Sequence, residues 1–215
     1  MGWLSRTIDS SIGRKTVMAV TGLILALFVV VHLAGLANIF GGRIAFTAYA
    51  ARLHDLGGLL RLGEIFLLLV FLLHLGFGLL LFLENRRAKP TRYAVNQSAG
   101  GRTWGSLSMP YTGFVLLLFL LLHLAHFHFT DSASLSDRLR ESLAQPVTGI
   151  FYLTALLTLG LHLSHGLWSS LQSLGVSHPK YDRFLEGGGL GISVFITTLF
   201  CMIPLLALFW PGFLR

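Results

Sequence analysis

The sequence predicts an all-α integral membrane protein, a bundle of five transmembrane helices that forms one domain over residues 1–215. Its composition is 54% hydrophobic and only 12% charged, whereas a soluble domain carries about 25% charged residues. Five apolar stretches reach the length of about 20 residues that a helix needs to cross a bilayer. Lipid cannot satisfy backbone polar groups, so these stretches are expected to be helices rather than strands.

The five predicted spans cover residues 17–38, 62–84, 110–130, 147–172 and 190–210. The first span is too long for the apolar core of a signal peptide and contains His32, so we expect it to be retained. The second contains no Asp, Glu, Lys or Arg between Ile65 and Leu83.

Four connections join the predicted spans. Residues 39–61 form an outer connection, and residues 85–109 form the longest inner loop. Within 131–146, leucines recur every four residues, which predicts a short amphipathic helix on the outer interface that ends at Pro146. The inner loop 173–189 ends in the glycine-rich stretch EGGGLG, which follows no strand and is therefore no dinucleotide fingerprint.

Lysine and arginine are distributed unevenly between the two sides that these spans define. With the N-terminus inside, ten lie on the inner side and six on the outer side, which favours a cytoplasmic N-terminus in a bacterial inner membrane. The net charge of +7 is therefore attributed to topology rather than to nucleic-acid binding. The inner residues are Arg6, Arg14, Lys15, Arg86, Arg87, Lys89, Arg92, Arg102, Lys180 and Arg183, and the outer ones are Arg43, Arg52, Arg61, Arg138, Arg140 and Arg215.

An internal repeat links the spans. The first contains MAVTGLILALFVVVHLA from Met18, and the third contains MPYTGFVLLLFLLLHLA from Met109. Both read M-x-x-T-G-x9-H-L-A. The second and fourth spans share a shorter pattern, H-L-x-x-G, which begins at His74 and at His162.

The repeat places one histidine inside each of four spans: His32, His74, His123 and His162. Polar side chains are costly at that depth and by default mark a site in the bundle interior. One histidine alone is explained equally well by an interhelical hydrogen bond worth under about 1–2 kcal/mol. Four in four helices favour metal ligation. The spans offer no carboxylate or partner cysteine for a bare zinc or copper ion, whereas paired imidazoles hold a low-spin haem.

We therefore expect two haems b as cofactors, with His32 and His123 on an outer haem and His74 and His162 on an inner one. Each ligand would bind iron through Nε2, with Nδ1 donating to the carbonyl one turn earlier, at Phe28, Val70, Phe119 and Thr158. Gly78 and Gly166, four residues after their histidines, would leave room for a macrocycle edge or for close helix packing.

The other five histidines are weaker candidates. His126 and His165 lie one turn beyond His123 and His162, so either is an alternative ligand. His54, His128 and His178 are expected at the surface. Cys201 is the only cysteine, which excludes an iron–sulfur cluster or a C-x-x-C-H haem attachment within this chain, and we expect it in the core of the fifth span.

With these residues in place, the chain resembles the cytochrome b membrane anchors of succinate dehydrogenases and fumarate reductases. The resemblance is carried by IGRKTVMAVTGLILALFVVVHLAG, GEIFLLLVFLLH and HLSHGLWSSLQSLG, and it extends over nearly all of the chain. The most similar type is the single-chain anchor that holds two haems b and works with menaquinone. Its four axial ligands and their pairing correspond to His32, His74, His123 and His162.

The resemblance implies an electron relay with two partner subunits. An iron–sulfur subunit on the cytoplasmic face would exchange electrons with the inner haem, and an FAD flavoprotein beyond it would interconvert succinate and fumarate. The outer haem would exchange electrons with menaquinone. Some relatives carry a glutamate two residues before the fourth-span ligand, but this chain has Gly160 there, so we assign no proton path to that position. Pairing of two such heterotrimers is left open.

A quinone site also needs a group that exchanges protons. Glu64, at the outer start of the second span, is our first candidate, followed by His54, Asp55 and Arg52. The alternative role of Glu64 is to complement the dipole at a helix N-terminus. Arg14, Lys15 and Arg102 inside, or Arg43 and Arg52 outside, could pair with haem propionates, but none is assigned.

Three other functions compete with this interpretation. The chain could be the two-haem anchor of a formate dehydrogenase or a hydrogenase. It could be a transporter that uses intramembrane histidines for a metal or for protons. It could also be a haem-free structural anchor.

Overall fold

The computed structural model describes residues 2, 10–87, 104–210 and 212 and is all-α in these ranges. Five helices are long and apolar enough to cross a membrane, as expected of a multi-pass membrane protein. In chain order the elements are α2 (Ser11–Leu36), the 3-10 helix η1 (Ala37–Gly41), α3 (Gly42–His54), α4 (Gly58–Arg87), α5 (Trp104–Phe127), α6 (Leu135–Ala144), α7 (Pro146–Ser173) and α8 (Asp182–Phe209).

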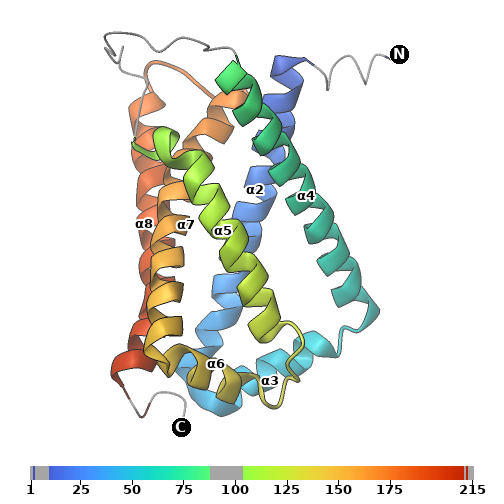
Figure 1. Ribbon diagram of the computed structural model, residues 1–215, viewed down its shortest axis with the longest axis vertical. Coiled ribbons are helices and arrows are strands. Elements are labelled where there is room, and N and C mark those ends of the chain that lie inside the picture. The colour runs from blue at the N-terminus through green and yellow to red at the C-terminus, as the bar shows by residue number, and fades with distance from the viewer. Residues whose placement is uncertain (1, 3–9, 88–103, 211, 213–215) are drawn as a thin grey trace.

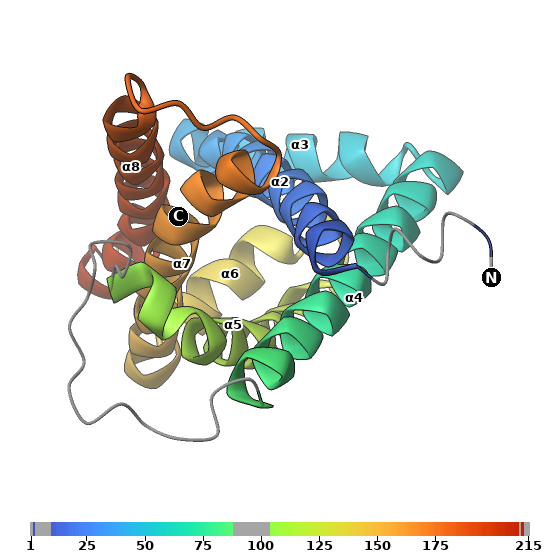
Figure 2. The ribbon, with the colours of Figure 1, turned by 90° about the horizontal axis from the view of Figure 1, so that it is seen from above.

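The long helices run up and down between two ends of one bundle (Figure 1). Seen from above, α2, α4, α5 and α7 surround a common interior, and α8 lies outside them against α7 (Figure 2). The most extensive packing joins α7 with α8, α5 with α7, and α2 with both α4 and α7. We call the end that holds the start of α2 the amino end. The end that holds α3 and α6 is the capped end.

The predicted spans are correct in number and order, but three helices begin six or more residues earlier than predicted, among them α5, at Trp104 rather than residue 110. The first helix begins at Ser11 rather than residue 17, because Ser10 caps it by accepting a 3.0 Å hydrogen bond from the Gly13 amide. The last helix begins at Asp182 rather than residue 190, so the loop predicted over 173–189 is too long. The EGGGLG stretch is helical. A Cβ at Gly189 would lie 3.7 Å from the Trp168 backbone nitrogen, an ordinary contact distance, so α8 packs against α7 there without needing a glycine.

The outer connection at residues 39–61, for which no secondary structure was predicted, is largely helical. Most of it forms η1 and α3, and together with α6 these helices close the capped end. The amphipathic helix predicted within 131–146 is present as α6, with Leu139 and Leu143 buried. As predicted, α6 ends just before Pro146: its last residue is Ala144, and Gln145 is extended, as the residue before a proline usually is. Pro146 itself occupies the first turn of α7, where its missing N–H has no cost.

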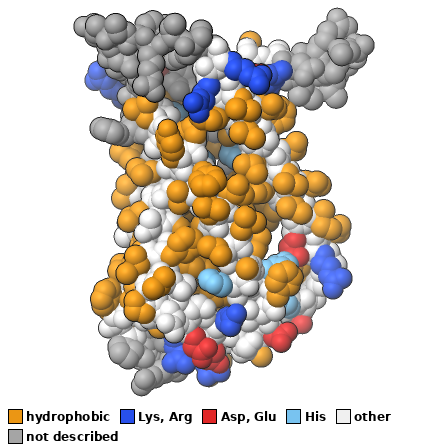
Figure 3. Space-filling view, in the orientation of Figure 1, with side chains coloured by type: hydrophobic (Ala, Val, Ile, Leu, Met, Phe, Trp, Pro, Cys, Tyr) orange, Lys and Arg blue, Asp and Glu red, His pale blue; other side chains and the backbone are white. Residues whose placement is uncertain are grey.

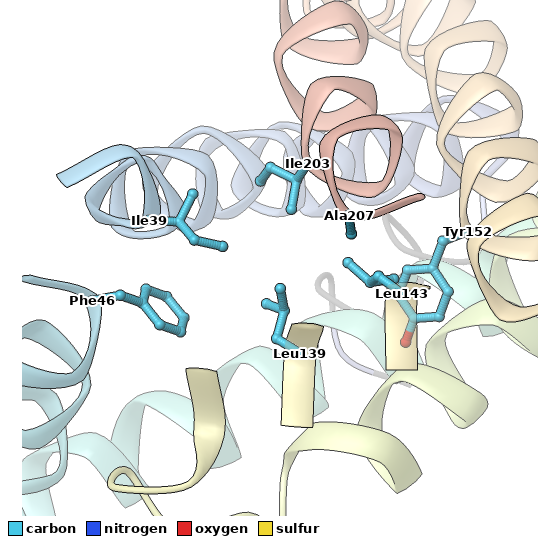
Figure 4. Close-up of a cluster of buried hydrophobic side chains, with 7 residues drawn as sticks. All are labelled: Ile39, Phe46, Leu139, Leu143, Tyr152, Ile203 and Ala207. Carbon is cyan, nitrogen blue, oxygen red and sulfur yellow. The ribbon is translucent and has the colours of Figure 1, made fainter. Parts of the chain in front are cut away.

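A cluster of buried apolar side chains holds the capped end together (Figure 4). It joins η1, α3, α6, α7 and α8 through Ile39, Phe46, Leu139, Leu143, Tyr152, Ile203 and Ala207. Because Tyr152 lies in this cluster and on α7, the cap also fixes one polar group near the bundle interior. A second cluster between α7 and α8 contains Cys201, which is buried as predicted.

Charged side chains gather at the two ends and hydrophobic ones cover the middle of the visible face, as a membrane-spanning bundle requires (Figure 3). Two ion pairs join helices at these ends. At the amino end, the Arg14 guanidinium donates to the Glu84 carboxylate and links α2 to α4. At the capped end, Arg43 Nη2 donates to Asp137 Oδ2 over 2.5 Å and links α3 to α6.

The contact between α7 and α8 depends on small residues. Ser193 Oγ donates a 2.6 Å hydrogen bond to the Gly160 carbonyl. A Cβ at Gly160 would lie 2.5 Å from Thr197 Oγ1 and 3.1 Å from its Cγ2. Position 160, where some relatives in the resembled family carry a glutamate, therefore faces α8.

We expect Gly160→Leu to lower the thermal unfolding midpoint of the detergent-solubilised protein, measured by circular dichroism. Overpacking at such a contact costs roughly 1–3 kcal/mol, because the β-branched Thr197 has little freedom to move aside. Gly191→Leu on α8 is the matched control, since a Cβ there meets no atom within 4 Å. Equal midpoints for the two variants would show that the α7–α8 contact tolerates the added volume.

Candidate functional site

The four histidines predicted as ligands lie on four helices and at two levels of the bundle. His32 on α2 and His123 on α5 lie in the last third of their helices, near the capped end. His74 on α4 and His162 on α7 lie near the middle of theirs. All four side chains are partly buried.

The structure brings these rings together in two pairs, the same two pairs that the repeat predicted. The ring centres of His32 and His123 are 5.9 Å apart, and the ring planes are at 88°. Those of His74 and His162 are 6.4 Å apart, at 67°. The paired helices, α2 with α5 and α4 with α7, are not among the most extensively packed pairs. The rings therefore approach one another from helices that do not pack closely.

The ring separations suit a single metal atom between the two members of each pair. Two imidazoles bound from opposite sides, each through a bond of about 2 Å, have ring centres roughly 6 Å apart. Among the described residues, no group of three or more His, Cys, Asp or Glu side chains is arranged to hold a metal ion. Each pair thus supplies two ligands, fewer than zinc takes from protein, and a porphyrin supplies four more. The residues fit the expected haems.

Threonines from neighbouring helices contact the rings of the pair near the middle of the bundle. Thr21 Oγ1 on α2 lies 3.2 Å from Nδ1 of His74, and Thr112 Oγ1 on α5 lies 3.1 Å from Nδ1 of His162. The expectation that Nδ1 bonds the carbonyl one turn earlier, at Val70 and Thr158, is wrong for these two histidines. The threonine hydroxyls take that place. Both threonines belong to the M-x-x-T-G repeat, and no role was predicted for them from the sequence.

The pair near the capped end has a different, more aromatic environment. His32 stacks between Phe28 and Phe200, with ring centres at 5.6 and 6.1 Å. Nδ1 of His123 lies 3.5 Å from the Tyr152 hydroxyl, which also lies 3.3 Å from Nδ1 of His126. Among the described residues, neither ring bonds the carbonyl predicted for it, at Phe28 or Phe119. Tyr152 was not predicted, because no sequence pattern connects this residue of the fourth span to His123 in the third.

The alternative ligands His126 and His165 do not join the ring pairs. The His126 ring stacks on Tyr152, with centres 6.2 Å apart and planes at 15°. The His165 Cβ lies against Gly105 of α5, where an added Cβ would approach within 2.8 Å. This placement favours His123 over His126, and His162 over His165, as the candidate ligands.

Glu64 lies on the first turns of α4, and its side chain is partly exposed at the capped end. Its Oε1 is 4.0 Å from Nδ1 of His128, so α4 and the turn that follows α5 present an acid and an imidazole to each other there. His128 was expected only as a surface residue. His54 and His178 are exposed as expected, and His54 Nδ1 bonds the Ala50 carbonyl of its own helix at 2.9 Å.

The two glycines predicted beside the macrocycle differ from each other. A Cβ at Gly78 would lie 3.3 Å from Cε of Met18, which supports close packing of α4 on α2. A Cβ at Gly166 would meet no atom within 4 Å, which leaves space on that face of α7. Of the cations considered for propionates, Arg14 and Arg43 are engaged in ion pairs, Lys15 and Arg52 are exposed, and Arg102 lies outside the described residues.

Comparison with known proteins adds no family to this description. No protein-family model, curated protein or solved structure matches the chain.

Proposed function

We propose that this protein is a di-haem cytochrome b that anchors a succinate:quinone oxidoreductase or quinol:fumarate reductase in the membrane. It would relay electrons between an iron–sulfur subunit at the amino end and menaquinone near the capped end. The succinate or fumarate chemistry would take place on an FAD flavoprotein bound to the iron–sulfur subunit. The proposal rests on the two intramembrane histidine pairs and on the family resemblance of the sequence.

The single observation that carries the proposal is the meeting of four histidines as two separate ring pairs at two levels. A transporter that moves protons or metal ions needs no such symmetry, and a structural anchor needs no intramembrane histidine. Ring separations of 5.9 and 6.4 Å suit one metal atom in each pair. Two sites at different depths are what an electron relay across part of a membrane requires.

Each residue of the site has a defined task in this relay. Haem b, when bound, supplies reversible one-electron chemistry at iron. His32 and His123 would hold one iron, and His74 and His162 the other, through the Nε2 lone pairs. The apolar spans exclude water and ions from both sites. Charge moved fully across the membrane changes in energy by about 2.3 kcal/mol per 100 mV, so the working direction affects the energetics.

Proton exchange with the quinone is proposed for Glu64, supported by its position at the end of the bundle that holds His32 and His123. Its neighbour His128, 4.0 Å away, supplies a second group that can take up and release protons. The partly exposed position of both side chains allows exchange with the aqueous side.

The membrane orientation is also proposed. Described basic residues at the amino end include Arg14, Lys15, Arg86, Arg87, Lys180 and Arg183, and those at the capped end are Arg43, Arg52, Arg61, Arg138 and Arg140. Five more basic residues lie outside the described residues, and the sequence assigns Arg6, Lys89, Arg92 and Arg102 to the first side and Arg215 to the second. The resulting bias favours a cytoplasmic amino end. The iron–sulfur subunit would then dock on that side of a bacterial inner membrane.

The purified chain is expected to contain two haems b, measured by the pyridine haemochrome assay against protein concentration. His32→Ala or His123→Ala should remove one haem, and His74→Ala or His162→Ala should remove the other, because an axial ligand is lost. His126→Ala and His165→Ala are the matched controls and should keep both. A colourless wild-type protein would support the transporter or the structural anchor instead. A molybdenum- or nickel-containing partner would indicate the anchor of a formate dehydrogenase or hydrogenase.

Glu64→Gln should retain both haems and lower menaquinol-dependent turnover by at least tenfold, because the amide cannot exchange protons. Glu141→Gln on α6, an exposed carboxylate at the same end, should leave turnover unchanged. Full turnover of a Glu64→Gln protein that keeps both haems would remove Glu64 from the proposed site.

A further inference from the structure

The threonine and glycine of the repeat occur twice in the same structural setting. Thr21 and Gly22 on α2 lie against His74 of α4, and Thr112 and Gly113 on α5 lie against His162 of α7. Both threonines are 5% exposed. Two segments far apart in the chain thus make equivalent contacts to the two members of one histidine pair.

We propose that the pairs Thr21–Gly22 and Thr112–Gly113 are two matching cradles that fix the protonation and orientation of His74 and His162. Through these two imidazoles, the cradles would set the reduction potential of the haem held near the middle of the bundle. This inference rests on the proposed haem-binding function. The four residues would be positioning residues, since none of them touches the metal.

The hydrogen-bond partners of the threonines define the direction of each contact. A hydroxyl has one proton, and Thr21 Oγ1 donates it to the Val17 carbonyl at 2.7 Å. Thr112 Oγ1 donates in the same way to the carbonyls of Ser108 and Met109, each at 3.1 Å. With that proton directed to a carbonyl, each hydroxyl oxygen can accept, which favours the tautomer with the histidine proton on Nδ1. That tautomer keeps the Nε2 lone pair free for iron.

The glycines define where each ring lies. A Cβ at Gly22 would approach Cε1 of His74 to 3.2 Å, and a Cβ at Gly113 would lie 3.8 Å from Cε1 of His162. Cε1 is the ring carbon between the two nitrogens. Nδ1 therefore faces the threonine hydroxyl, and Cε1 faces the glycine. Nε2 is the ring atom after Cε1, so it lies beyond both cradle residues.

The consequence for iron is electronic. A hydrogen bond from Nδ1 to an acceptor makes the imidazole a stronger donor and favours the ferric state, which lowers the reduction potential. Among the described residues, the His32 ring has no hydrogen-bond partner and stacks on Phe28 and Phe200, and Nδ1 of His123 lies 3.5 Å from the Tyr152 hydroxyl. The cradles therefore distinguish one site from the other.

The test is a redox titration of the visible α-band in the full-length protein, purified with any subunits that accompany it. Thr21→Val and Thr112→Val keep the side-chain shape but remove the acceptor. Each should raise the midpoint of the same one-electron step and leave the other step unchanged. A roughly tenfold change in the preference for ferric over ferrous iron corresponds to about 59 mV. Thr21→Ser and Thr112→Ser should restore the wild-type midpoints.

Thr198→Val is the matched control, because Thr198 makes the same bond to its own helix, to the Val194 carbonyl at 2.8 Å, but lies exposed on α8. It should leave both midpoints unchanged. A second pair of variants addresses packing. Gly22→Ala should alter the low-spin ferric EPR signal of that haem, because the His74 ring must move, whereas Gly113→Ala meets an ordinary contact distance and should have the smaller effect.

The inference is overturned if both valine variants bind two haems and leave all midpoints unchanged, or if they shift different steps. A wild-type protein without haem would instead overturn the proposed function. These two failures are distinguished by the haem content measured before each titration.

Discussion

A histidine ring inside a lipid-embedded helix has two nitrogens that the bilayer cannot satisfy, and this constraint organises the bundle. Four helices each carry one such ring, and the rings can find partners only if the helices surround a common interior. The arrangement of α2, α4, α5 and α7 meets that requirement (Figure 2). Their ring pairs are the principal polar features at the two levels where they occur.

The remaining elements support this interior, and α8 also contributes Phe200, which stacks on His32. The contact of α8 with α7 depends on Gly160, where an added Cβ would approach Thr197 Oγ1 to 2.5 Å. The cap of η1, α3 and α6 closes one end through its apolar cluster (Figure 4). Tyr152 belongs to that cluster and also contacts His123 and His126, so the packing of the cap extends to the ring pair beneath it.

Hydropathy and the repeat were enough to predict the long helices and the pairing of the rings, because both depend on patterns within single segments. The sequence did not reveal that residues 39–61 are helical, since their packing against α6 depends on contacts distant in the chain. The partners of Nδ1 were mispredicted for a similar reason. A carbonyl one turn earlier is always near in sequence, whereas Thr21 and Thr112 approach His74 and His162 only after the helices assemble.

In each repeat, threonine and histidine are eleven residues apart, which is close to three full turns of helix and roughly 16 Å along the axis. On α2, Thr21 contacts one ring pair and His32 belongs to the other, and both therefore lie on the same helix face. The same holds for Thr112 and His123 on α5. When α2 or α5 tilts or shifts as a rigid body within the bundle, its contacts at both levels move together. The interval between them is maintained by backbone hydrogen bonds along α2 and α5, so side-chain repacking elsewhere leaves it nearly constant.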